Sequence, residues 1–288
     1  MILESFSLGL LSGIVFGVAD LIAVVATRRI NVIRLLLWSH IGAVVIATLY
    51  LALGEELPSI PLTSFAILGG LTVLSLGMLV TFYKGLEAGP VALVIPIISA
   101  HVIFVVFLSV LFLGEDIGLL QGLGLAMVTI GIVFSSMTVG SPFSGSIYLG
   151  KGVLYALLTM TCAGFFIFGV GAMSQELGWF LPLYLIRVIG LVILAPVQIA
   201  TRGMSLLSPS LTIVLVAVMV GILQVIGLAG YSIGAEVGSV SLVAAGFSIY
   251  PIIPIVGGLI FFKERLIPRQ TFGVASVLVG LLVFLIST

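Results

Sequence analysis

The chain has 288 residues, of which 61% are hydrophobic and only 7% are charged. A soluble domain carries about 25% charged residues, so this chain cannot cover a globule with polar surface. The composition excludes a soluble enzyme, a nucleic-acid-binding protein and a disordered chain, and it indicates an integral membrane protein. Ten Lys and Arg residues balance ten Asp and Glu residues, so the net charge indicates no charged partner.

Apolar stretches of about 20 residues, the length that crosses a bilayer as a helix, recur along the whole chain. Glycine, proline and charged residues separate them, as in Gly54-Glu55-Glu56. The runs are continuous, which excludes the alternating strands of a membrane β-barrel. We therefore predict an all-α integral membrane protein with ten transmembrane helices, at residues 7–27, 33–53, 62–86, 90–113, 117–137, 151–174, 180–200, 210–234, 240–262 and 269–287.

The second half of the chain repeats the first at a constant offset of 149 residues. Each repeat holds five predicted helices, an odd number, so successive repeats must enter the bilayer in opposite directions. We predict two inverted five-helix repeats, residues 1–137 and 151–288, with a connector at 138–150 and with helices five and ten at the periphery. Scarce polar residues match in register, which composition alone does not explain: Glu87 with Glu236, Glu115 with Glu264, and Gln121 with Gln270.

Two motifs occur once in each half. The first is Gly-x-Glu-x-Gly-x-Val at 85–91 and again at 234–240, and the second is a Glu followed by Gln-x-x-Gly, within 113–124 and 262–273. Together they resemble the drug/metabolite transporter superfamily, in its ten-helix EamA-type branch. The resemblance covers nearly the whole chain and implies export or exchange of small metabolites, such as amino acids or sugars, or of drugs.

The basic residues are distributed unevenly between the two faces of the predicted bundle. Nine of the ten fall in or beside loops that follow odd-numbered helices, and the tenth, Arg187, lies inside helix seven. The face that holds both termini carries acidic residues and no Lys or Arg. Because basic loops stay in the cytoplasm, we predict a multi-pass protein of the plasma membrane with both termini outside. The EamA-type family more often has its termini inside.

Rare polar side chains near the middle of helices four and nine are candidate substrate ligands. Ser99 and His101 follow Pro96, and Ser248 and Tyr250 occupy the equivalent positions in the second repeat. A helical proline leaves the carbonyl four residues earlier unpaired, which is tolerated at mid-membrane where that carbonyl lines a cavity. We predict a substrate site between these two helices. The alternative is that His101 and Tyr250 bond each other or a carbonyl and hold the helices together.

Three further polar residues lie in predicted spans one and eight. Gln224 and Tyr231 add hydrogen-bonding groups to the substrate site, and the Gln224 amide has enough donors and acceptors to hold a carboxylate or an amide. The alternative for Gln224 is an interhelical hydrogen bond. Asp20 is suited to proton coupling or to pairing with a substrate amine. Its alternatives are a pair with Arg28 or Arg29, or a place at the membrane interface.

Arg187 matches the position at which the EamA-type pattern has an arginine. We interpret it as structural, bonding carbonyls at a helix junction. Two histidines and the single Cys162 are too few for a zinc site, and we expect neither a metal nor a cofactor.

The function that these features favour is secondary transport by alternating access. The expected cargo is a small metabolite, amino-acid-like or otherwise amphipathic, with protons as a candidate coupling ion. The expected partners are the lipid bilayer and the solute, for a chain that acts as a monomer or a homodimer. The alternatives are an intramembrane enzyme, for which no nucleophile elbow is present, and a non-transporting membrane scaffold.

Overall fold

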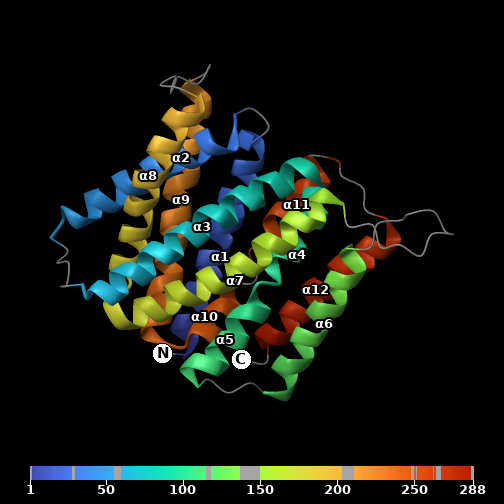
Figure 1. The fold of residues 1–288 in the computed structure, drawn as a ribbon. Helices are drawn as coiled ribbons and strands as arrows, with labels where there is room; N and C mark the ends of the chain where they lie inside the picture. The colour runs from blue at the N-terminus through green and yellow to red at the C-terminus, as the bar shows by residue number, and fades with distance from the viewer. Residues whose placement is uncertain are drawn as a thin grey trace.

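The computed structural model describes residues 2–27, 30–54, 60–114, 118–136, 150–202, 211–247, 250, 252–261, 263 and 267–286. These ranges contain helices and no strand (Figure 1). The helices are α1 (Ile2–Thr27), α2 (Val32–Leu51), α3 (Leu62–Ala88), α4 (Val91–Ser99), α5 (Val102–Leu113), α6 (Leu119–Ser136), α7 (Lys151–Leu177), α8 (Phe180–Arg202), α9 (Leu211–Val237), α10 (Val240–Phe247), α11 (Ile252–Phe261) and α12 (Pro268–Ile286).

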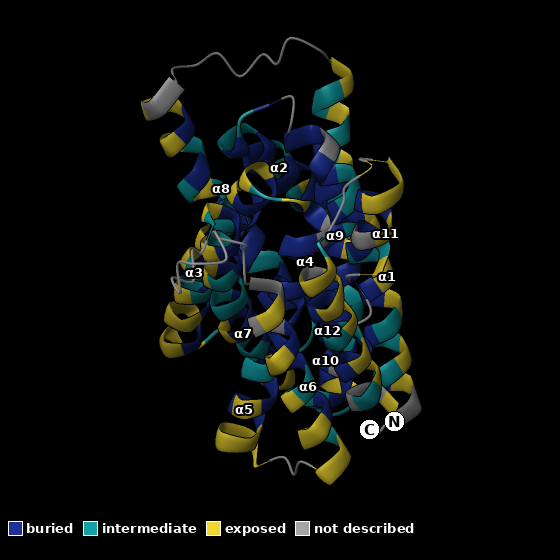
Figure 2. Cartoon of the chain, turned by 90° about the vertical axis from the view of Figure 1, so that its right-hand side faces the viewer, coloured by how far each residue is buried: buried dark blue, intermediate teal, exposed yellow. Residues whose placement is uncertain are grey.

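The helices have the length and composition of membrane spans. Side chains such as Leu111, Val192 and Leu215 are exposed on the outside of the bundle, where a soluble protein would carry charge. Figure 2 shows the buried residues gathered inside and the exposed ones on the outward faces. Within the described ranges seven segments are long and apolar enough to cross a membrane: Glu4–Val24, Val32–Leu51, Leu62–Ala88, Leu93–Leu113, Lys151–Leu177, Phe180–Ala200 and Leu211–Val237.

Two predicted helices are each divided in the structure. The segment predicted as one helix at 90–113 is α4 and α5, and the segment at 240–262 is α10 and α11. At the first break, the amide N–H of His101 donates to the Ile98 carbonyl at 3.0 Å, a three-residue spacing that tightens the turn. Pro96 weakens the ladder there, and the Ser99 hydroxyl donates to the Pro96 carbonyl at 2.7 Å. Each of these predicted spans therefore consists of two helices, and Leu93–Leu113 still has the length and composition of one membrane span.

The packing of the long helices brings the two halves of the chain together. Helix α1 packs along α9 and α10, and helix α7 packs along α3 and α4. Helix α2 lies against both α8 and α9. The centre of the bundle is therefore enclosed by helices from both halves.

Helices α6 and α12 form a pair at one edge of the bundle (Figure 1). Glycines replace side chains along their contact, so the two backbones approach closely. The Ser276 hydroxyl donates to the Met127 carbonyl at 3.0 Å. The same contact occurs in both directions between the two helices. Gly131 of α6 lies against Gly273 and Val277 of α12, and Gly280 of α12 lies against Gly124 and Val128 of α6.

The start of α1 and the end of α12 lie at the same end of the bundle in both views (Figures 1 and 2). Hydrogen bonds between helices join this end. They are Ser5 Oγ to the Gly234 carbonyl at 2.7 Å, the Trp179 amide to Glu236 Oε2 at 2.8 Å, Ser64 Oγ to Glu176 Oε1 at 3.0 Å and Gln175 Nε2 to the Gly238 carbonyl at 3.1 Å. This end of the bundle is closed by direct contacts.

Candidate functional site

An internal cavity of about 70 Å³ lies between the two halves of the chain. It is lined by parts of α1, α3, α4, α7, α8, α9 and α10, with His101 and Tyr250 at the helix breaks. A single buried water needs roughly 10–15 Å³ by the same measure, so the cavity has space for several waters or part of a small solute.

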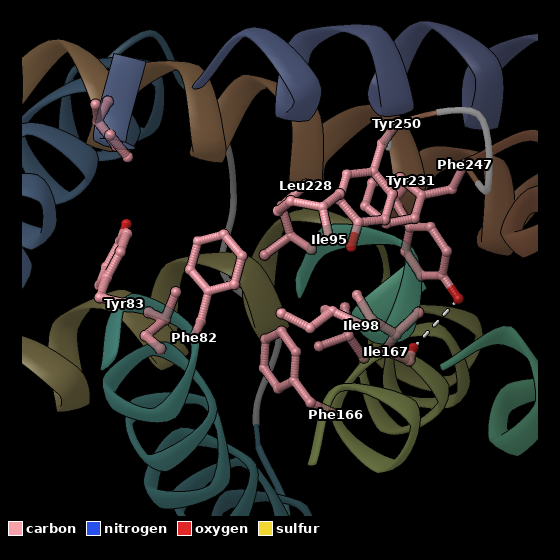
Figure 3. Packing of buried hydrophobic residues seen from close by; sticks show 14 of the residues in the cluster. Phe82, Tyr83, Ile95, Ile98, Phe166, Ile167, Leu228, Tyr231, Phe247 and Tyr250 are labelled. Carbon is pink, nitrogen blue, oxygen red and sulfur yellow. Dashed lines mark hydrogen bonds between the residues drawn. The ribbon is translucent and has the colours of Figure 1, made fainter. Parts of the chain in front are cut away.

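Most of the cavity wall is apolar and aromatic. Phe16, Phe82, Phe166 and Phe247 all line it. Figure 3 shows Phe82, Phe166 and Phe247 arranged around aliphatic side chains from α4 and α9. Such a wall favours a solute with an apolar body over a fully hydrophilic one.

Polar side chains interrupt this wall at a few positions. Four of the predicted site residues, Asp20, His101, Gln224 and Tyr250, line the cavity, although they come from four separate parts of the chain. All four are buried within the protein. A mostly apolar cavity with a few convergent polar groups is the usual form of a small-molecule site.

His101 stands at the α4–α5 break, against an aromatic wall. Its ring lies 6.1 Å from the Tyr250 ring, which stacks on Phe247 at 5.2 Å. Because a carbonyl only accepts hydrogen bonds, His101 Nδ1, 3.1 Å from the Ile98 carbonyl, carries the proton and Nε2 is an acceptor. The His101 side chain therefore bonds within its own chain segment and still offers one nitrogen to a ligand.

Two further predicted substrate residues, Ser99 and Tyr231, do not line this cavity. The Ser99 hydroxyl is turned back to the Pro96 carbonyl. The Tyr231 hydroxyl donates to the Ile167 carbonyl at 3.2 Å, the dashed line in Figure 3, and joins α9 to α7. Ser248 lies outside the described residues. The Ser99 and Tyr231 hydroxyls are thus both used in hydrogen bonds to backbone carbonyls near the cavity.

Asp20 is 5% exposed and lines the cavity from α1. Within the described part of the chain, no hydrogen bond or ion pair reaches its carboxyl group. The predicted alternative partners, Arg28 and Arg29, lie outside the described residues. An acidic side chain buried against apolar walls is costly, and such groups are retained where they serve a function.

Arg187, which sequence reasoning treated as structural, also lines the cavity. It is 6% exposed, and its Nε has no hydrogen-bond partner among the described residues. His40 lies nearby, with its ring packed against Gly190 and its Nδ1 bonded to the Leu36 carbonyl at 2.9 Å. The signal in the sequence was the rarity of a charged residue inside an apolar helix. The sequence did not show whether the Arg187 side chain points into the bundle or along a helix junction.

Residues 5–137 match the model of the EamA-like transporter family. Over this region, the chain is similar to the EamA-like transporter family. A solved crystal structure of a protein is similar over 97% of this chain and 97% of its own length, with a TM-score of 0.67 and 17% identity. At that identity the likeness shows the fold alone. No curated protein matches the sequence.

The family match, together with the seven apolar helices long enough to cross a membrane in the described ranges, indicates a multi-pass membrane protein. Members of the family are transporters and not enzymes, which favours a binding role for the buried polar residues of the cavity. The family name does not identify the solute. The chemistry of this EamA-like cavity is therefore the evidence on which a substrate class must rest.

Proposed function

We propose that the chain is a secondary transporter that moves a small amphipathic metabolite across the plasma membrane by alternating access, as an exporter or an exchanger. The observation that carries the proposal is the central cavity, which both halves of the chain line with apolar walls and a few buried polar groups. Membrane transporters bind their solute near the midplane between two repeats, which is the arrangement that this cavity suits.

The proposed fold has ten spans in two inverted five-helix repeats. In it α4 with α5 and α10 with α11 are two broken spans, and the shorter α6 and α12 are spans five and ten. The packing supports this, because α1 meets α9 as α7 meets α3, which are equivalent pairs at the 149-residue offset. The Ser276–Met127 hydrogen bond also joins two positions that are 149 residues apart, as contacts on a two-fold axis do.

In the proposed site, His101, Tyr250 and Gln224 contact the solute, and Asp20 carries a proton. His101 Nε2 is an acceptor, the Tyr250 ring is a stacking surface, and Gln224 Oε1 is a buried acceptor without a partner among the described residues. Tyr231 joins α9 to α7 by donating to the Ile167 carbonyl, and Ser99 donates to a carbonyl of its own helix. Ser248 remains a candidate by its equivalence to Ser99.

Alternating access requires the bundle to close one end while the other opens. The hydrogen bonds at the end that holds both termini, including Trp179 to Glu236 and Ser64 to Glu176, support the proposal that this is a closed gate. Each of these bonds can be broken and exchanged for water, so the gate can open without a large loss of energy.

The transport function can be tested with purified protein in liposomes, by counterflow of a panel of labelled amphipathic metabolites. We expect at least one to exchange, and His101→Ala to weaken its binding about ten- to a hundredfold, because one hydrogen bond to a charged ligand contributes about 1.5–3 kcal/mol. Ser109→Ala, which alters a buried hydroxyl on α5 away from the cavity, is the matched control and should exchange normally. Exchange of nothing in the panel would contradict the transport function.

The orientation can be tested by labelling single cysteines from outside intact cells, in a Cys162→Ala background. We propose that both termini lie outside, because nine of ten basic residues fall beside the loops of the other face. A cysteine placed at Ser59 should then react with an impermeant reagent, and one placed at Ser144 should react only after the cells are opened. The reverse pattern would invert the orientation.

A further inference from the structure

Arg187 is a buried charge for which the described residues provide no ion pair. Its side chain is 6% exposed and lines the cavity, and its Nε has no hydrogen-bond partner among the described residues. A buried carboxyl group can become neutral by taking up a proton, but a guanidinium stays charged at any pH that a cell meets. Of the two charged residues in the cavity, Arg187 is therefore the one that requires an oppositely charged partner.

Two uncharged polar side chains lie near Arg187, and each has a polar atom that makes no hydrogen bond of good geometry to the described residues. The Tyr83 hydroxyl is fully buried and has no hydrogen-bond partner among the described residues, and the same holds for Gln224 Oε1. The Gln224 amide lies close enough to the Tyr83 hydroxyl to interact with it, although no hydrogen bond of good geometry joins them in the described structure. Tyr83 lies within electrostatic range of Arg187 but behind the residues that line the cavity. Figure 3 shows the Tyr83 hydroxyl directed away from the aliphatic cluster around Ile98. Buried polar groups left open in this way are expected to be bonded when the site is occupied.

We propose, on the basis of the transport function above, that Arg187 with Tyr83 and Gln224 forms an anion subsite that binds the carboxylate of an amphipathic solute. The guanidinium has a planar fork that matches a carboxylate with two parallel hydrogen bonds. The Gln224 amide donates a further hydrogen bond to the same group, and the Tyr83 hydroxyl, buried beside Gln224, orients that amide. The apolar body of the solute lies against Phe16, Phe82 and Phe247.

A single negative charge fits this subsite better than two. Arg187 is the only Lys or Arg among the residues that line the described cavity, and Asp20 is an acid in the same space. A monoanion leaves Arg187 neutralised, whereas a dianion such as a phosphate monoester leaves one charge buried without a partner, which is strongly unfavourable. We therefore expect a carboxylate to be preferred over a phosphonate on the same carbon skeleton.

The test compares three probes that share a phenyl group and differ in the charge at the end of the chain. They are 3-phenylpropanoate, its uncharged isostere 3-phenylpropanamide, and 2-phenylethylphosphonate. Binding is measured in detergent by the concentration of each probe that raises the melting temperature of the purified protein, because a ligand stabilises the state that it binds. We expect the wild-type protein to bind the propanoate about tenfold more tightly than the amide or the phosphonate.

The variants assign that preference to particular residues. Arg187→Gln should weaken propanoate binding about tenfold or more and leave amide binding within about threefold, and Arg187→Lys should recover part of the loss. Tyr83→Phe, which removes one oxygen, should weaken propanoate binding about fivefold, and it tests the subsite even if Arg187→Gln does not fold. Gln198→Leu is the control, because Gln198 is a buried amide on the same helix outside the cavity lining, and it should keep the preference.

Several results would overturn the subsite. These are equal binding of propanoate and amide by the wild-type protein, tighter binding of the phosphonate, no propanoate binding at millimolar concentration, or a preference that survives both Arg187→Gln and Tyr83→Phe. Transport is measured separately, by counterflow in liposomes. If the protein binds propanoate through Arg187 but moves no solute, the anion subsite is supported and the transport function is contradicted. If it moves solutes without a preference for charge, the transport function is supported and the anion subsite is contradicted.

Discussion

Asp20→Asn should abolish gradient-driven accumulation of solute while counterflow exchange stays within about threefold of wild type. Asn has the size of Asp but cannot take up and release a proton, so it removes coupling and preserves the shape of the cavity. Accumulation against a gradient needs the proton, whereas counterflow needs only that the loaded carrier change sides. The expected difference is thus nearly complete loss in one assay and little change in the other.

The measurement uses liposomes with and without an imposed pH gradient, loaded with the same solute. Glu4→Gln is the control, because it neutralises another acid of α1 that lies outside the cavity lining, and it should leave both assays unchanged. If Asp20→Asn accumulates solute normally, Asp20 does not carry the proton. If both assays fail together, Asp20 is part of the binding site for the solute.

Gly221→Ala should destabilise the folded protein by about 3 kcal/mol, because it places a methyl group against another helix backbone. Gly221 of α9 faces the backbone of Ser39 in α2, and an added Cβ would overlap the Ser39 carbonyl group. That carbonyl belongs to the helical ladder and cannot turn aside as a flexible side chain could. The two helices would have to separate, which loses contacts along their whole length.

Gly77→Ala is the matched control for this change. Gly77 lies in the interior of α3, and nothing stands within 4 Å of an added Cβ there. Because alanine is the better helix former, by up to about 1 kcal/mol, this variant should melt at or slightly above the wild-type temperature. The melting temperature and the monodisperse fraction in detergent are measured for both variants. Equal melting temperatures would show that α2 and α9 are not packed as closely as described.

The sequence predicted the long helices well, because their length and apolar character are set by the membrane. The spans predicted at 33–53 and 180–200 are α2 (Val32–Leu51) and α8 (Phe180–Arg202), each within about two residues. Pro96 marked the first of the two divided segments, but the division after Ser99 was not predicted. Whether a proline bends a helix or ends it depends on which neighbours bond the released groups, and those neighbours lie far away in the sequence.

The candidate site was predicted in part, and its errors have a common cause. Asp20, His101, Gln224 and Tyr250 were found because polar groups are rare in such a chain, and all four line one cavity. Ser99 was equally rare, but its hydroxyl donates to the Pro96 carbonyl of its own helix, a bond that serine readily makes. Arg187 was assigned to a structural role because spacing along a helix does not tell which way a long side chain points.

The break between α4 and α5 places His101 at a pivot. An unbroken helix of that length moves as one rigid body, so tilting one end of it also displaces its middle. Here two short helices meet at Ala100 and His101. Both pack against α7, and they differ in their second neighbours, α11 for α4 and α10 for α5. A residue at a pivot moves least when the helices turn. The contacts that His101 makes with a ligand can therefore stay the same on both sides of the membrane, which keeps the affinity for that ligand similar in both orientations.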